Sequence, residues 1–437
     1  MELLKNNKGI TLIILVVTII VLLILAGISI SAITGGDSSM DKAKKAKDET
    51  AIKAEMEELQ EIINQSAAKG IRHGNYSGSA DSQTIRNALK KNKLIEENPD
   101  DVIIDGKNGW KVTGVKTGQK YKIRYDGEVT RIEELAPTKI YGKIADGVLY
   151  LRATEQTGYA EGTKWNDSTI TKVIIEEPIA PSTCREMFKD CTNLETIENI
   201  DNLHTENSIN MSNMFRDCSS LQEVDLNNFD TSEISTLYAM FAGCSKLKKL
   251  NLSSFDTKKV TNMSYMFSGC NDLEIIDIST LNTSKVNNMS NMFNNCINLK
   301  ELNVNNFDTS NVDNMSSMFY QCTSLNKLDI RNFNTAKVTN MAYMFRFCKN
   351  IEELDLGNFN TNMVTIMNNM FQGCISLKKI YSSNLFSTNL VTESEDMFNN
   401  TPKLVGGQGT TYNSSYLDKT YARIDSGPSN PGYFTSK

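Results

Sequence analysis

Apolar positions in the second half of the chain recur with a fixed period, and polar residues fill the positions between them. The clearest marker is a Met-Phe pair that occurs nine times at intervals of 26 or 27 residues, from Met187-Phe188 to Met397-Phe398. In eight of the nine units a Cys follows three residues after the Phe. A fixed period of this length is typical of stacked supersecondary units, which bury their apolar faces against one another. We therefore expect more than half of the chain to form a solenoid.

The unit that runs from Leu247 to Cys270 shows two different spacings within one repeat. It opens with the pattern L-x-x-L-x-L, ending at Leu252, which fits the strand of a leucine-rich repeat. From Val260 to Cys270 the apolar residues are three, four and three positions apart, which is the stripe of a short helix. Each rung is therefore predicted to hold one short strand and one short helix. A column of Asn residues precedes these helices, and we interpret it as a set of N-caps: Asn210, Asn262, Asn288, Asn314 and Asn340.

The repeat pattern weakens at both ends, as expected for the capping units of a solenoid. Residues 148–151 predict a cap strand before the first rung, and residues 420–424 predict a closing strand after the last. Thr401 replaces the Cys in the last unit. We accordingly assign an N-terminal cap to residues 138–182, the repeats to residues 183–401 and a C-terminal cap to residues 402–437.

The repeat has the form L-x-x-L-x-L-x-x-F-D/N-T-x-x-V-x-N-M-x-x-M-F-x-x-C, which resembles the BspA-type leucine-rich repeat, also met in mycoplasma surface lipoproteins. The stretches 406–412 and 431–434 are similar to the usual ending of that family. The resemblance covers roughly residues 138–437. It implies a bacterial cell-surface protein that adheres to host or matrix components, and it implies no particular ligand.

The N-terminus carries a second strong signal. Residues 10–33 are almost entirely apolar and follow two lysines, so we expect a transmembrane helix over residues 10–34 with the rest of the chain outside the cell. The sequence around Gly9 and Ile10 resembles a prepilin leader, which makes residues 1–9 the leader and these two residues the candidate cleavage site. Pilins carry Glu at the fifth mature position, whereas this chain has Ile14, and this difference counts against filament assembly. A plain, unprocessed membrane anchor is the alternative.

Between this segment and the solenoid, residues 35–137 predict a helix and a small sheet. An apolar stripe that includes Leu59 runs through residues 40–64, with alternating charges elsewhere. Glycine turns then separate short alternating segments at 110–115, 120–124 and 128–132, which indicates an antiparallel sheet. A helix packed on such a sheet is pilin-like, and a simple stalk is the alternative. The predicted fold class is thus α+β, with a pilin-like transmembrane helix and a small sheet before a leucine-rich-repeat α/β solenoid of about nine rungs.

The charge and the cysteines narrow the possible functions. A net charge of −6 with 22% charged residues argues against a nucleic-acid-binding protein that relies on a basic patch. All nine cysteines lie in the repeat region, and all except Cys184 occupy one inward column. We expect them to be buried free thiols rather than disulfides. The Met and Cys columns could together bind Cu(I), but core packing explains them without a metal.

Polar residues on the outward strand face form the candidate partner-binding surface. The Asp and Asn residues in it could hold Ca²⁺, although we interpret them as a solvated face and predict no metal or cofactor. A further Thr column, from Thr231 to Thr361, is expected to bond to the backbone of turns. The candidate binding residues are Glu223, Asp225, Lys249, Asn251, Asp277, Glu301, Asn303, Lys327, Asp329, Arg331, Glu353 and Asp355.

Nothing in the sequence predicts an enzyme. The two histidines, His73 and His204, belong to no recognisable motif, and the glycine-rich stretch at 406–409 is interpreted as a turn. We predict a single-pass, membrane-anchored surface adhesin or binding protein, whose partner is an extracellular protein or glycan and not a nucleic acid. The alternative is a pilus-associated subunit that carries the solenoid as cargo. A prepilin peptidase would be a further partner if the leader is cut.

Overall fold

The computed structural model of the protein describes residues 39–72, 101–104, 107–113, 120–124, 129–131 and 136–437. These residues fall into two compact units that divide near residue 133. The first unit contains helix α2 (Ser39–Arg72). It also contains a four-stranded sheet in the order β1-β2-β3-β4, in which β3 pairs antiparallel with both β2 and β4. The strands are β1 (Asp101–Ile104), β2 (Lys107–Thr113), β3 (Lys120–Arg124) and β4 (Val129–Arg131).

Tyr121 links the helix to the sheet. Tyr121 of β3 is fully buried, and its hydroxyl donates to Glu55 Oε2 at 3.1 Å and lies 3.3 Å from the carbonyl oxygen of Ile52. Leu59 and Ile63 are buried on the same stripe of α2, one and two turns after Glu55. The predicted helix and antiparallel sheet of this region are confirmed.

The pilin-like transmembrane helix of the predicted fold class is not supported. Among the residues that the structure describes, no helix combines the length and apolarity needed to cross a membrane. Helix α2 itself is rich in Lys and Glu. The predicted span 10–34, the leader 1–9 and its cleavage site at Gly9 and Ile10 all lie outside the described residues. The first unit is therefore a charged helix packed on a small sheet.

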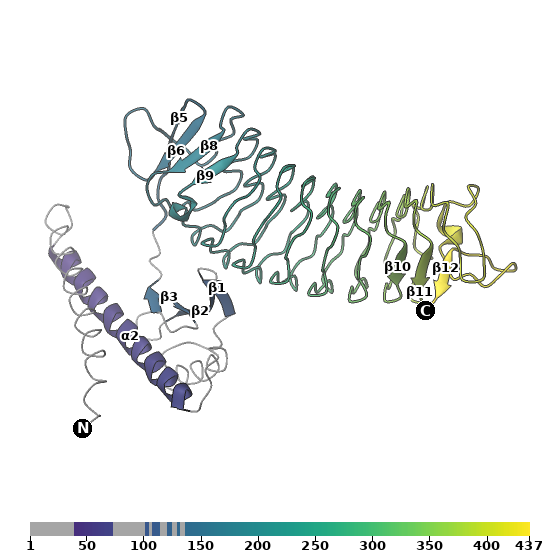
Figure 1. Ribbon diagram of the computed structural model, residues 1–437, viewed down its shortest axis with the longest axis horizontal. Coiled ribbons are helices and arrows are strands. Elements are labelled where there is room, and N and C mark those ends of the chain that lie inside the picture. The colour runs from purple at the N-terminus through teal and green to yellow at the C-terminus, as the bar shows by residue number, and fades with distance from the viewer. Residues whose placement is uncertain (1–38, 73–100, 105–106, 114–119, 125–128, 132–135) are drawn as a thin grey trace, which may run out of the picture. The chain divides into compact units, whose positions relative to one another are not determined.

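The second unit is a solenoid whose rungs follow one another from the sheet that contains β5 to the C-terminus (Figure 1). A five-stranded sheet in the order β7-β5-β6-β8-β9 opens it, and a parallel sheet in the order β10-β11-β12 closes it. The cap strand predicted at 148–151 is confirmed as β6. The closing strand predicted at 420–424 is wrong, because η2 (Lys419–Tyr421) is a 3₁₀ turn there and β12 closes the sheet instead. The strands are β5 (Tyr141–Ala145), β6 (Val148–Arg152), β7 (Ala160–Glu161), β8 (Lys172–Ile175), β9 (Thr196–Glu198), β10 (Glu353–Leu356), β11 (Lys379–Ser382) and β12 (Phe434–Ser436), and η1 (Ile200–Asn202) follows β9.

The predicted helix in each rung is wrong, and the solenoid is mostly β, with about nine turns. In the rung from Leu247 to Cys270, the segment predicted as helix is a series of tight turns. Tyr265 and Gly269 have left-handed backbones, with φ of 61° and 76°, which an α-helix does not accommodate. The N–H groups of Met263 and Phe267 donate to the next rung, to Asn288 O at 3.1 Å and Met292 O at 2.9 Å. The backbone is thus satisfied partly by the next rung and partly by tight turns within the rung, in which Ser268 N–H donates to Tyr265 O at 3.0 Å and Cys270 N–H to Phe267 O at 3.2 Å.

The interior is a stack of identical side chains, because every rung places the same residue at the same depth. Nine Phe rings follow one another with centroids 5.5 to 6.0 Å apart and with nearly parallel planes. Such stacked pairs contribute about 0.5 to 1.5 kcal/mol each beyond the area they bury. The ladder is Phe188, Phe215, Phe241, Phe267, Phe293, Phe319, Phe345, Phe371 and Phe398.

The cysteines lie beside this ladder as free, buried thiols, as predicted. Cys296, for example, donates its thiol hydrogen to the carbonyl oxygen of Phe267 in the preceding rung, with Sγ 3.2 Å from that oxygen. Burial raises the pKa of Cys296 to about 12, so the thiol stays protonated in the folded protein. The thiols therefore pack as small apolar groups that also satisfy one carbonyl in each rung.

The threonine column bonds to turn backbone, as predicted. Thr283 is buried, and its hydroxyl donates to Asp308 O at 3.0 Å and accepts from Asp308 N at 2.8 Å, both in the following rung. The same arrangement recurs along the solenoid. Buried threonines that donate to the next rung are Thr205, Thr231, Thr257, Thr283, Thr309, Thr335 and Thr361.

Candidate functional site

The structure brings the predicted strand-face residues together on one continuous surface. Asn251 bridges Asp277 in the next rung, and Glu353 and Asp355 of β10 pair in parallel register with β11. Of the twelve candidate binding residues named from the sequence, Asp329 and Asp355 are half-buried and the others are exposed. Their exposure and these register positions place them on the outward side of the rungs, and their role in binding stays a prediction.

The Asp and Asn side chains of this face stabilise turns of the backbone. Asn251 accepts a hydrogen bond from the backbone N–H of Ser253 at 3.0 Å, and Asp277 does the same for Ser279 at 2.9 Å. These are Asx turns, in which a short side chain fixes the backbone two residues further on. The hydrogen bonds from Ser279 hold the pKa of Asp277 below its usual value. No group of three or more His, Cys, Asp or Glu side chains placed to hold a metal occurs in the described part of the chain.

Charged side chains around this face pair from one rung to the next. Lys300 Nζ lies 2.6 Å from Glu274 Oε2, and Lys378 Nζ lies 2.8 Å from Glu352 Oε2, with 26 residues between partners in each case. On the face itself, Arg331 contacts Asp329 at 2.6 Å and lowers the pKa of that carboxyl to about 2. Exposed pairs of this kind contribute little to stability, but they neutralise the surface charge that a partner would otherwise meet.

A second surface, which the sequence analysis missed, runs along the turns around each Met-Phe pair. We call it the turn edge and define it by three positions in every rung: the residue before Met, the residue after Phe and the residue before the Cys position. The first and third positions are left-handed in all nine rungs. Asn, Asp or Gly, which tolerate this conformation best, fill most of them, and that column could have revealed the turns in the sequence. The exceptions are Glu186, Ala239, Tyr265, Ser317, Gln321, Tyr343 and Phe347.

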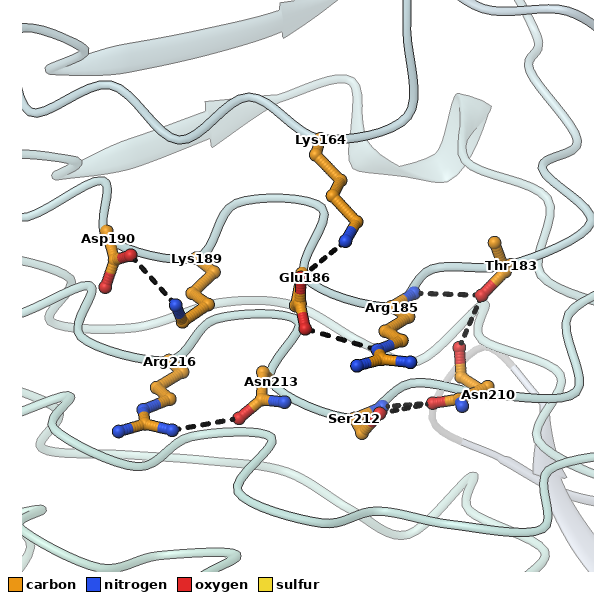
Figure 2. A network of polar contacts seen from close by, with 10 residues as sticks. All are labelled: Lys164, Thr183, Arg185, Glu186, Lys189, Asp190, Asn210, Ser212, Asn213 and Arg216. Carbon is orange, nitrogen blue, oxygen red and sulfur yellow. Dashed lines mark hydrogen bonds and ion pairs between the residues drawn. The ribbon is translucent and has the colours of Figure 1, made fainter.

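The first two rungs carry a charged network on the turn edge (Figure 2). Glu186 accepts hydrogen bonds from Lys164 Nζ at 2.5 Å and from Arg185 Nε at 3.2 Å, and the Lys164 bond lowers the pKa of Glu186. In the same edge columns, Lys189 pairs with Asp190 at 3.1 Å, and Arg216 follows in the next rung. Each charge in this part of the edge thus has a partner within the protein.

The same network shows what the Asn column does. Asn210 Oδ1 accepts from the backbone N–H of Ser212 at 2.8 Å and from its hydroxyl at 2.5 Å, and it lies beside Thr183 in Figure 2. Asn262 and Ser264 repeat the contact at 2.9 Å. The predicted capping hydrogen bond therefore exists, but it stabilises the entry to a left-handed turn rather than a helix N-terminus.

Further along the turn edge, aromatic side chains gather around an arginine. Tyr320, Tyr343 and Phe347 surround the guanidinium of Arg346, whose Cζ lies 5.6, 5.3 and 4.8 Å from their ring centroids. Tyr320 and Phe347 also meet edge to face, with centroids 6.1 Å apart. All four side chains are half-buried. We call these four residues the Arg346 cluster.

These features define a mostly β solenoid, with inward Met, Phe and Cys columns and a turn edge of changing chemistry. The chain belongs to the family described as "Mycoplasma protein of unknown function, DUF285", whose model matches residues 182–302 and 287–408. No curated protein and no solved structure matches the chain. The match confirms the mycoplasma-type repeat in the resemblance. It does not confirm a BspA-type leucine-rich-repeat identity or a prepilin leader.

Proposed function

We propose that the protein is a bacterial cell-surface binding protein, an adhesin that recognises an extracellular protein or glycan along its solenoid. One observation carries this proposal: the interior keeps Met and Phe in every rung, while the three turn-edge positions differ between rungs. They are Glu186, Lys189 and Asp190 in the first rung, three Asn residues in the fifth, and Tyr343, Arg346 and Phe347 in the seventh. A scaffold that fixes its core and varies one edge is suited to multipoint recognition over a long surface. No catalytic activity is proposed.

The turn edge is the better candidate for this recognition than the strand face. Aromatic and arginine side chains carry most of the binding free energy in protein interfaces. The Arg346 cluster lies on the turn edge, whereas the Asp and Asn column of the strand face is committed to Asx turns. Tyr265, another turn-edge residue, is 38% exposed and meets Tyr238 of the preceding rung edge to face, with ring centroids 5.9 Å apart.

The resemblance to BspA-type repeats supports the same proposal, because adhesion is the activity most often attributed to that family. Location at the cell surface forms part of the proposal. Protease treatment of intact producing cells tests it directly, since a surface protein is digested while a cytoplasmic marker survives. A protein that stays intact until the cells are lysed would contradict the proposed location.

Cell adhesion tests the binding function. Cells that lack the protein are compared with cells that produce it, on surfaces coated with matrix proteins or with host glycans. We expect adhesion to at least one coating to fall without the protein and to return with the wild-type chain. A chain with Asn at the seven exceptional left-handed positions should fold, because Asn fits that backbone, yet should not restore adhesion. Equal adhesion by all these cells would contradict the proposal.

A further inference from the structure

We propose that the Arg346 cluster binds an acidic carbohydrate, a sugar whose carboxylate pairs with the Arg346 guanidinium while its ring stacks on the neighbouring aromatic side chains. The carboxylate belongs to a uronic or a sialic acid residue. This inference rests on the proposed function and deepens it, because it names a ligand class for one part of the turn edge.

The guanidinium of Arg346 is a cation without a counter-ion. Among the described residues it makes no hydrogen bond or ion pair, and its Nε is buried without a partner. Two other arginines of the solenoid do have a counter-ion, since Arg152 contacts Glu177 at 2.6 Å and Arg216 contacts Asp217 at 3.2 Å. A planar guanidinium held between rings keeps its charge and its fork of donors, which match a carboxylate. Charge complementarity therefore points to an anionic ligand group.

Two of the rings around Arg346 belong to residues with an unfavourable backbone conformation. Tyr343 and Phe347 are left-handed, with φ of 61° and 59°, a backbone conformation that is unfavourable for a bulky residue. Folding does not require these rings, because Asn291 and Asn295 occupy the equivalent positions two rungs earlier with φ of 58° and 59°. Strain that the fold can avoid is characteristic of functional positions.

The following rung holds the cluster in place. At Gly373, which has a φ of +73°, an added Cβ would clash with the Phe347 ring, so the glycine provides the space in which that ring lies. The Phe347 ring then lies against both Arg346 and Tyr320. A site that is ordered before the ligand arrives loses less conformational entropy on binding.

Two unpaired polar atoms favour a saccharide over an acidic peptide. Gln372 occupies the same edge position as Arg346 in the next rung, about 5 Å further along the stack, and its Oε1 is a buried acceptor without a partner. A carboxylate and a hydroxyl on one sugar ring would pair with Arg346 and Gln372 together. The sugar C–H groups would meet the faces of the rings, which carry partial negative charge.

Titration calorimetry on the full chain tests the proposal. The probes are a hyaluronan tetrasaccharide, which contains uronic acid, and sialyllactose, with lactose as the neutral control and a tetraglutamate peptide as the acidic control. We expect one acidic saccharide to bind at least tenfold more tightly than lactose and than the peptide. The two saccharides distinguish the uronic from the sialic source.

Three variants use residues that the chain already places at the same positions in other rungs. Arg346→Gln and the double variant Tyr343→Asn with Phe347→Asn should each weaken saccharide binding at least tenfold. The matched control, Asn291→Ser with Asn294→Ser, should bind like the wild type. Thermal unfolding followed by circular dichroism shows whether each variant is folded.

Saccharide binding that is unchanged in folded Arg346→Gln would overturn the proposal, and so would tighter binding of the peptide or no binding of any probe. None of these outcomes decides the proposed function, because the cell adhesion test does not depend on which ligand the Arg346 cluster takes. Loss of saccharide binding in the cluster variants alone would establish the site.

Discussion

Buried hydroxyl and thiol groups join consecutive rungs at two points. The threonine hydroxyls donate to and accept from backbone of the next rung, and the thiols donate to carbonyl oxygens of the preceding one. Both columns were visible in the sequence, since Thr and Cys recur every 26 residues. The direction of their hydrogen bonds was not, because it depends on which backbone atoms stacking brings near.

Replacing Thr283 with Val tests the threonine contact. The shape of the side chain is retained, but the backbone N–H and C=O of Asp308 lose the partly buried hydrogen bonds that they make with the buried Thr283 hydroxyl. We expect the free energy of unfolding to fall by about 1 to 3 kcal/mol in urea denaturation. The control is Thr339→Val, an exposed residue bonded to Asp313 O at 3.2 Å, where water can replace the contact and the loss should stay below about 0.5 kcal/mol.

The buried thiols predict that stability is lost at alkaline pH. Burial raises the pKa of Cys296 and of Cys374 from 9.0 to about 12, so the unfolded chain releases these protons at lower pH than the folded one. Their contribution is complete below pH 9 and is lost as the pH rises from there toward 12. Each thiol should lower the free energy of unfolding by about 1.4 kcal/mol per pH unit in that window.

Urea denaturation at pH 8, 9 and 10 measures this loss. Cys296→Ala is the matched variant, since it has one titrating thiol fewer while its Tyr and Lys residues are unchanged. Its decline between pH 9 and 10 should be shallower than that of the wild type. An identical decline would show that the thiol pKa does not differ between the folded and unfolded states.

At the scale of the element, tight left-handed turns set the form of every rung. The spacing of three, four and three apolar residues predicted a helix from Val260 to Cys270, but the same spacing arises when two left-handed residues turn the chain and return the side chains to the core. Tyr265 and Gly269 are those residues in this rung. Periodicity alone does not separate the two forms, because both place the same side chains inward.

Glycine substitutions in two rungs separate backbone strain from side-chain contact. Gly269→Ala adds a Cβ that lies 3.4 Å from backbone of Gly243, an available space, so the cost is the left-handed conformation, about 1 kcal/mol. Gly373→Ala has the same conformational cost and must also displace the Phe347 ring. We expect the second variant to be less stable than the first in thermal unfolding. Equal melting temperatures would contradict the contact between Gly373 and the ring.

At the scale of the whole molecule, the solenoid depends on contacts between neighbouring rungs. Each Phe ring stacks on the rings before and after it, and each backbone ladder joins adjacent units. A solenoid built in this way should tolerate the removal of whole rungs, since the new neighbours present the same surfaces.

Deleting residues 245–296, which is two periods of 26, should leave a folded protein. Cys244 would then precede Ile297, as Cys296 does now. We expect small-angle scattering to show a solenoid shorter by about 10 Å, at roughly 5 Å per rung. A deletion of 13 residues, half a period, is the control and should prevent folding because it brings unlike positions together. Collapse of the chain with whole rungs removed would argue against independent stacking.

The sequence by itself determined the period, the inward columns, the caps before the first rung and the free thiols, because each follows from a side chain that recurs at one depth. It also predicted the helix and the small sheet that precede the solenoid. Tertiary structure alone decided that the rungs are turns rather than helices, since the next rung supplies partners for N–H groups, such as those of Met263 and Phe267, that a helix would pair within itself. Stacking likewise created the Arg346 cluster, because Tyr320 meets Arg346 and Phe347 only when two rungs lie side by side.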